Sequence, residues 1–239
     1  MNYQWDWSVL LQAPYGEWLL TGLGWTVLIT LFSWTLALVV GVIFGAARSL
    51  PNRFVQFIAS IYIEVFRNVP ALVQLFLWYF VFPEVVPQAF GMWVKRGMPY
   101  PEFITAVVAI GLFAGARVAE QVRAGVAAVG AHLLPAALAT GLRPLQAFRL
   151  ILFPLGMRAI IWPLTSEFLI TMKMSSIALT IGLLELTGES RHIANYTFHG
   201  LEVFAAATVG YLLLGLCVTS LMRLINSRFG SLDQQMGES

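Results

Sequence analysis

The sequence predicts an all-α, polytopic membrane protein with five transmembrane helices. Of its 239 residues, 59% are hydrophobic and only 11% are charged, whereas a soluble globular domain carries about 25% charged residues. The hydrophobic residues gather in runs that match or exceed the roughly 20 residues that a helix needs to cross a bilayer. These two observations exclude a water-soluble enzyme and leave room for five crossings surrounded by membrane lipid.

The first span is the clearest, because residues 19–47 contain no acidic or basic side chain. The first basic residue in the chain is Arg48, so residues 1–18 are expected to face away from the cytoplasm. A secretory signal peptide would start with basic residues, and this segment is therefore expected to be retained. Gly41 and Gly45 have the spacing of a close helix–helix contact, although such spacing is frequent in spans.

The next two spans differ in polarity. Residues 54–82 form a second apolar segment, but Glu64 and Arg67 lie near its middle. The three-residue spacing of this pair predicts an ion pair on one helical face, which would neutralise both charges. Residues 83–102 contain four prolines and are expected to form an outer loop. The third span is predicted for residues 103–128.

The second half of the chain contains two more spans and a polar stretch before them. Residues 130–149 are helical in pattern but too polar to cross lipid, so they are expected to lie on one side of the membrane. The fourth and fifth spans are predicted for residues 154–174 and 201–226. The short polar tail, residues 227–239, is expected to be disordered.

The distribution of basic residues predicts the orientation, because Lys and Arg accumulate in cytoplasmic loops. Three basic residues fall on one side of the membrane, namely Lys95, Arg96 and Arg191. Eight fall on the other side, namely Arg48, Arg53, Arg123, Arg143, Arg149, Arg158, Arg223 and Arg228. This count places the N-terminus outside the cytoplasm, and the loop over residues 130–149 and the C-terminus inside it.

Several partners and cofactors are not expected. The net charge of +2 is too small, and the basic residues too scattered, for a nucleic-acid partner. The single cysteine excludes an internal disulfide, and the three histidines lack metal-ligand spacing, so no metal or other cofactor is expected. No phosphate-binding loop motif is present, so any use of ATP requires another chain. An odd number of spans does not divide into two inverted halves, which also favours a partner.

Residues 117–158 resemble the cytoplasmic docking loop of ABC importer permeases of the polar amino acid type. The motif of that loop has Glu-Ala-Ala, a Gly a few residues on, and an apolar run that ends in Leu-Pro. The matching residues are Ala136, Ala137, Gly141, Leu142, Phe148, Leu152 and Pro154. Pro135 stands where most of the family has the motif's Glu, so docking is expected to depend on shape instead of on an acidic side chain.

The resemblance extends from residue 20 to residue 226. Residues 62–74 look like the family's second-span signature, and residues 163–182 fit its fourth-span pattern. The phrases EVFRNVP and GLFAGARVAEQVRA are similar to those of the glutamate/aspartate importer permeases.

The resemblance implies a type I ABC importer permease fold, with a cytoplasmic coupling helix, in the bacterial inner membrane. The chain would form half of the translocation pathway for a polar, acidic amino acid such as glutamate or aspartate, together with a second homologous permease subunit. An ATP-binding subunit dimer would bind the cytoplasmic loops, and a periplasmic substrate-binding protein would dock outside. ATP hydrolysis would then reside on a partner, and this chain would be a transport subunit and not an enzyme.

The coupling helix is expected over residues 135–142, lying parallel to the bilayer. A proline is harmless at the first position of a helix, where the missing N–H would be unpaired anyway. Small alanines allow close approach of another surface, and Gly141 permits a tight turn. An ordinary interfacial helix that only links two spans is the alternative. The expected coupling residues are Pro135, Ala136, Ala137, Gly141, Leu142 and Arg143.

Charged residues inside the spans are candidates for a substrate site, because each costs about 2.5 kcal/mol or more at the bilayer centre. Arg117 offers a guanidinium that can bind a carboxylate of an acidic substrate with two parallel hydrogen bonds. Glu120 lies three residues further on the same helical face. It either neutralises Arg117 or binds the ammonium group of the substrate.

Four further polar residues are candidates for the same substrate cavity. Glu167 and Ser166 follow Pro163, where a kink leaves free carbonyls and favours a polar wall. Lys173 either lines this cavity or extends to the outer interface, and Gln74 either faces the cavity or forms a hydrogen bond between helices. The expected substrate-contacting residues are therefore Arg117, Glu120, Glu167, Ser166, Lys173 and Gln74.

Two other functions remain open at the level of the sequence. An ATP-independent channel or ion-coupled carrier would use the buried charges as a proton relay. A non-transporting membrane scaffold is the third option, and it would leave Arg117, Glu120 and Glu167 without a role.

Overall fold

The computed structural model of the chain describes Tyr3 and residues 5–229, with side chains described as far as Leu224. Within that part the secondary structure is helical and contains no strand, as predicted. The backbone of the last helix continues to Phe229, while residues 230–239, most of the predicted disordered tail, lie outside the described part.

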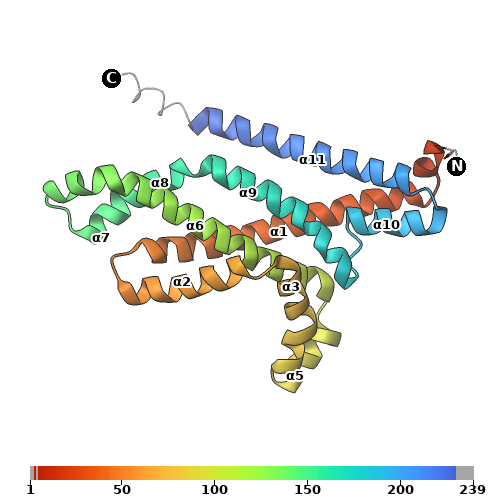
Figure 1. Cartoon of the computed structure of the whole chain (residues 1–239), viewed down its shortest axis with the longest axis horizontal. Helices are drawn as coiled ribbons and strands as arrows, with labels where there is room; N and C mark the ends of the chain where they lie inside the picture. Colours follow the sequence, from red (N-terminus) through yellow and green to blue (C-terminus); the bar gives the residue numbers. More distant parts are fainter. Residues whose placement is uncertain (1–2, 4, 230–239) are drawn as a thin grey trace.

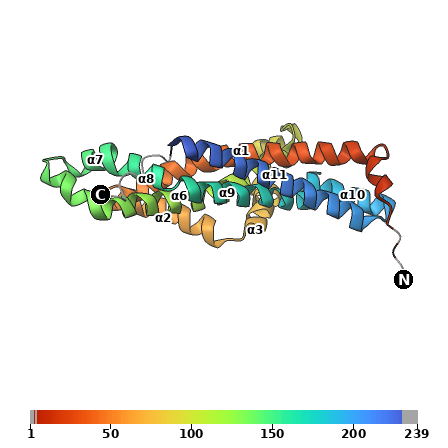
Figure 2. The ribbon, with the colours of Figure 1, turned by 90° about the horizontal axis from the view of Figure 1, so that it is seen from above.

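Within the described residues, three helices are long and apolar enough to cross a membrane: α1 (Tyr15–Ser49), α6 (Pro101–Ala139) and α11 (Gly200–Phe229, tested as far as Leu224). They correspond to the first, third and fifth predicted spans. Figure 1 shows all three running roughly along the long axis of the molecule, and Figure 2 shows the same arrangement from above. Two further pairs of helices would pass as spans only if each bent pair is one crossing, which gives up to five within the described residues.

The second predicted span is broken near its middle. Helix α2 (Arg53–Asn68) ends before Pro70 and α3 (Ala71–Phe76) begins after it, and the chain bends by 103° between residues 53–68 and residues 71–85. Proline cannot donate a backbone hydrogen bond and disfavours helical geometry in the residue before it. The segment predicted as the second span, residues 54–82, is therefore broken near its middle, and it counts as a span only if the bent pair is one crossing.

Residues 77–97 form an arm that projects from the rest of the molecule (Figure 1). The arm consists of η2 (Leu77–Val81), α4 (Phe82–Val85), α5 (Gln88–Met92) and η3 (Trp93–Gly97). The segment expected as an outer loop is thus largely helical, since Pro83, Pro87 and Pro101 stand at or just before the first turn of a helix, where the missing N–H is tolerated.

The fourth predicted span is also bent. The chain forms α7 (Pro144–Ala147), η4 (Phe148–Leu152), α8 (Phe153–Ala159), α9 (Ile161–Met174) and η5 (Ser175–Ile181). The bend of 54° falls between Ala159 and Ile161, inside the predicted range of residues 154–174. A last short helix, α10 (Leu186–Thr197), packs against α1 and α11.

Helix α6 is longer than predicted, because it continues through Pro135 to Ala139. The separate short helix expected over residues 135–142 is therefore wrong, and Pro135 does not open a helix. Leucines and alanines on both sides are strong helix formers, which offsets the hydrogen bond lost at the proline. The helix ends at Thr140, and Gly141 then adopts a φ of +86°, so the tight turn predicted at this glycine is confirmed.

Helices α1 and α6 pack closely along their length. A Cβ atom added at Gly41 would lie 2.5 Å from the Cβ of Val118, and one added at Gly45 would lie 2.6 Å from the carbonyl oxygen of Ala119. Such distances leave no room for any side chain. The close helix–helix contact predicted from the spacing of the two glycines is therefore confirmed.

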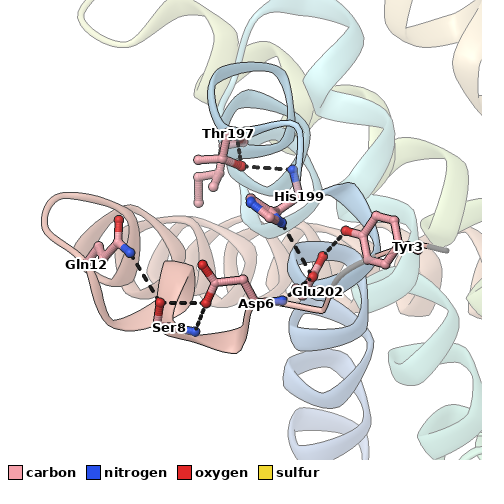
Figure 3. Close-up of polar contacts among 8 residues, drawn as sticks. Tyr3, Asp6, Ser8, Gln12, Thr197, His199 and Glu202 are labelled. Carbon is pink, nitrogen blue, oxygen red and sulfur yellow. Dashed lines mark hydrogen bonds and ion pairs between the residues drawn. The ribbon is translucent and has the colours of Figure 1, made fainter.

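The N-terminal segment is attached to the start of α11 (Figure 3). The buried carboxylate of Glu202 accepts hydrogen bonds from the hydroxyl of Tyr3 and from the backbone N–H of Asp6, the latter at 2.8 Å. Asp6 also caps η1 (Trp7–Leu11), since its side chain accepts from the Ser8 hydroxyl and amide. These bonds to Ser8 hold the pKa of Asp6 below its usual value. The segment before the first span is thereby fixed in place.

Candidate functional site

Helix α6 carries two groups of charged residues near its middle, and each group contacts different helices. In the first group, Nε of Arg117 donates to Oε1 of Glu167 on α9 at 2.5 Å. Gln121, one turn after Arg117, donates to the other carboxylate oxygen at 3.4 Å. The side chain of Glu167 is only 3% exposed, whereas that of Arg117 is 37% exposed. The ion pair thus has a buried anion and a cation that reaches the surface of the chain.

The free part of the Arg117 guanidinium is the chemically important feature of this group. Only Nε has a hydrogen-bond acceptor among the described residues, so the two terminal nitrogens remain available. These two nitrogens form a planar fork that matches the two oxygens of a carboxylate. Because Glu167 holds the guanidinium from one side, the orientation of the fork is set before any ligand arrives.

In the second group, arginines from three helices surround Glu120. Its carboxylate accepts hydrogen bonds from Nη1 of Arg48 and, at 3.1 and 3.0 Å, from Nε and Nη2 of Arg123. Nη1 of Arg67 lies 4.0 Å from the same carboxylate. We call these four residues the Glu120 cluster. Arg48 comes from the end of α1, Arg67 from the end of α2, and Arg123 from α6 itself.

The structure contains neither the ion pair predicted for Glu64 and Arg67 nor the pair of Arg117 with Glu120 that was one of two alternatives. Arg117 does not pair with Glu120, because each of them finds an oppositely charged partner on another helix. Glu64 does not pair with Arg67 either, and the structure describes no ion pair for Glu64. Spacing along one helix shows which residues share a face, but it does not reveal which partner a neighbouring helix supplies.

The other predicted site residues lie in different surroundings. Ser166 and Lys173 are exposed on α9 and, being seven residues apart, share one face of it. Gln74 is buried and donates to the carbonyl oxygens of Phe66 and Val69, at 2.7 and 2.8 Å. These carbonyls are left free by the break between α2 and α3. Of the two alternatives for Gln74, the hydrogen bond between helices is the one observed.

The predicted coupling residues lie at the far end of α6 and in the turn after it. Pro135, Ala136 and Gly141 are exposed, whereas Ala137 is buried against its own chain and is not presented to a partner. Leu142 is half-buried after the turn, and the backbone N–H of Arg143 donates to Gln146 at the start of α7. Two large exposed residues that the motif does not highlight, Leu138 and Leu145, add apolar surface here.

The predicted site residues did not include Gln121 or the three arginines of the Glu120 cluster. A signal existed for Arg123, which follows Glu120 with the spacing of an intrahelical ion pair. For Arg48 and Arg67 the sequence provides no such signal, since they lie 72 and 53 positions before Glu120.

Comparison with known proteins places the chain among transport proteins. The family described as "Binding-protein-dependent transport system inner membrane component" matches residues 37–231. The glutamate/aspartate import permease protein GltJ of Escherichia coli K12 is 38% identical over 236 residues, which cover 95% of this chain and 96% of GltJ. The glutamine transport system permease protein GlnP of the same organism is 31% identical over 226 residues, which cover 94% of this chain and 98% of GlnP.

Solved structures are similar over nearly the whole chain. A chain in the crystal structure of an amino acid ABC transporter with histidines superimposes with a TM-score of 0.80 at 27% identity, covering 95% of this chain and all of the other. A chain of the inward-facing MetNI methionine ABC transporter superimposes with a TM-score of 0.72 at 20% identity, over 90% of this chain and 97% of the other, which shows a shared fold.

Proposed function

The chain belongs to the family of binding-protein-dependent transport system inner membrane components, and from this membership we propose that it is the permease subunit of an ATP-driven importer of acidic amino acids. The resemblance to ABC importer permeases that the sequence predicts is confirmed. The chain is a multi-pass inner-membrane protein. The basic residues support a periplasmic N-terminus and a cytoplasmic C-terminus.

The observation that carries the substrate class is the half-exposed guanidinium of Arg117, held by the buried carboxylate of Glu167. A dicarboxylic amino acid differs from its amide by one negative charge, and an oriented guanidinium is the side chain best suited to recognise that charge. In this proposal Arg117 binds the side-chain carboxylate, and Glu167 positions Arg117 without touching the substrate. The similarity to a glutamate/aspartate permease supports the same class.

The remaining predicted residues receive different roles. Ser166 and Lys173 share the exposed face of α9, which in this proposal faces the second permease subunit across the pathway. There Lys173 supplies a second cation for an acidic substrate. Gln74 holds the break between α2 and α3 and has a structural role. In this proposal Glu120 does not bind the substrate's ammonium group, since its carboxylate pairs with Arg48 and Arg123.

Coupling to ATP is assigned to the cytoplasmic end of α6. From Arg117 to Ala139 the helix is continuous, a length of about 33 Å at 1.5 Å per residue. A continuous helix transmits a displacement at one end to the other, so a partner that moves the turn at Gly141 also moves Arg117. Exposed Leu138 and Leu145 supply apolar surface for an ATP-binding subunit. A periplasmic binding protein would deliver the substrate, and alternating access would follow the state of the ATPase dimer.

The direct test is reconstitution of the chain with the permease, ATP-binding and binding-protein subunits that its genomic neighbours encode. We expect the proteoliposomes to accumulate labelled glutamate and aspartate only with internal ATP and binding protein present. A panel that includes glutamine and histidine defines the specificity. Accumulation driven by a proton gradient without ATP would instead support the ion-coupled carrier, and preference for neutral amino acids would refute the acidic substrate.

Replacing Gly141 with aspartate is expected to uncouple ATP hydrolysis from uptake. The residue has a φ of +86° and open space around it, so the substitution adds a charge at the turn without creating a clash, and aspartate is among the residues that tolerate this φ. Uptake should fall on the order of tenfold, within the range of known coupling energies, while ATP hydrolysis by the reconstituted complex persists. Gly141→Asn is the matched control, since asparagine has a similar size and tolerates this φ but carries no charge. Normal uptake by Gly141→Asp would contradict the coupling role.

A further inference from the structure

The Glu120 cluster carries more positive charge than its carboxylate can balance. Three guanidiniums and one carboxylate leave two positive charges. Glu64 lies one turn before Arg67 but is exposed and forms no ion pair among the described residues, and Glu167 is already paired with Arg117. One arginine would be enough to neutralise Glu120. Like charges brought this close repel one another unless an anion joins them.

Two arginines of the cluster are also exposed enough to donate hydrogen bonds to a ligand. The side chain of Arg67 is 53% exposed and that of Arg123 is 41% exposed. Arg67 only approaches Glu120, at 4.0 Å, and forms no closer ion pair in the described part of the chain. Arg48, which is the least exposed of the three, holds Glu120 from the side of α1. The accessible guanidiniums are therefore those of Arg67 and Arg123.

The cluster lies further along α6 than Arg117, toward the end that carries the coupling turn. Arg123 follows Arg117 by six residues, which is a rise of about 9 Å along the helix and a rotation of about 120° around its axis. Glu120 stands between the two arginines in sequence. Along α6 the cluster is therefore the next group of cations between Arg117 and the coupling turn.

We propose that Arg67 and Arg123 form a second anion site, which takes the side-chain carboxylate of an acidic amino acid after it leaves Arg117. This inference rests on the proposed function and extends it to the release step. Glu120 competes with the substrate for the same guanidiniums, so the site binds weakly. A site on a transport path has to be weak enough to let the substrate go. Arg48 acts as a positioning residue, because it holds Glu120.

Chemical modification of arginine tests the site without relying on transport. The complete complex in proteoliposomes is treated with phenylglyoxal, and the modified arginines are quantified by mass spectrometry. We expect internal glutamate to slow the modification of Arg67 and Arg123, and glutamine to have no effect. Arg53, exposed on the same helix as Arg67 without a described ion pair, should react at an unchanged rate. Equal rates with and without glutamate, or equal protection by inorganic phosphate, would overturn the assignment.

Transport by an Arg67→Gln complex provides the second test, with Arg53→Gln as the matched control. Loss of one hydrogen bond to a charged group predicts that glutamate uptake falls on the order of tenfold relative to any change in glutamine uptake. Equal loss for both substrates at an unchanged melting temperature would reject the second site and leave the proposed function intact. Failure of the unmodified complex to import any acidic amino acid would reject the proposed function and this inference together.

Discussion

Replacing Arg117 with glutamine should lower the free energy of unfolding by about 3 kcal/mol, because it leaves the carboxylate of Glu167 buried without a cation. This loss lies at the lower end of the range for removing one partner of a buried ion pair. The carboxylate is only 3% exposed, but the guanidinium is 37% exposed. Equilibrium unfolding of the purified protein in detergent measures this change. The double variant Arg117→Gln/Glu167→Gln removes both charges and should recover most of the loss.

The double variant also separates folding from recognition, since it lacks the guanidinium but no longer contains an unpaired buried charge. In the reconstituted complex, we expect its glutamate uptake to fall by about tenfold or more relative to glutamine uptake, the value of a lost hydrogen bond to a charged group. Glu167→Gln alone keeps the guanidinium and should retain a preference for glutamate. If uptake of glutamate and of glutamine fell equally in the double variant, Arg117 would not recognise the side-chain carboxylate.

A valine at Gly45 is expected to destabilise the protein by about 3 kcal/mol, the upper end of the cost of overpacking. The new Cβ would lie 2.6 Å from the carbonyl oxygen of Ala119 and 2.7 Å from the Cβ of Val122. Since one of these contacts is backbone, relief requires α1 and α6 to move apart. The melting temperature of the detergent-solubilised protein measures the effect.

The matched control for this substitution is Gly24→Val on the same helix, where a Cβ atom would have no neighbour within 4 Å. Exposed substitutions of this kind change the free energy of unfolding by about 0.5 kcal/mol or less. Similar melting temperatures for the two variants would mean that the α1–α6 contact does not hold the fold together.

The parts of the fold that the sequence predicted correctly depend on local properties. A long uncharged run identifies α1, and a pair of glycines four apart identifies its contact face, because burial in lipid and close approach of backbones each require particular residues at particular positions. The turn at Gly141 is of the same kind, since a positive φ favours glycine. The break at Pro70 was visible as a proline, but its bend of 103° was not predicted.

Proline positions show why local rules also failed. Pro70 ends α2, whereas Pro135 lies inside α6 without ending it. The two residues have the same backbone chemistry. Around Pro70 the side chain of Gln74 satisfies the free carbonyls of the break, while Pro135 is flanked by strong helix formers. The surroundings, and not the proline alone, decide between a break and a continuous helix.

The amino-acid sequence by itself determined the membrane class, the apolar segments, the small residues of the α1–α6 contact and the family. Each of these follows from composition or from residues near one another along the chain. Only the tertiary structure decided how the charges are shared. Arg117 pairs with Glu167, 50 positions away, and Glu120 pairs with Arg48, 72 positions away. Ion pairing depends on the distances between side chains on different helices. These distances are fixed only when α1, α2 and α9 pack around α6.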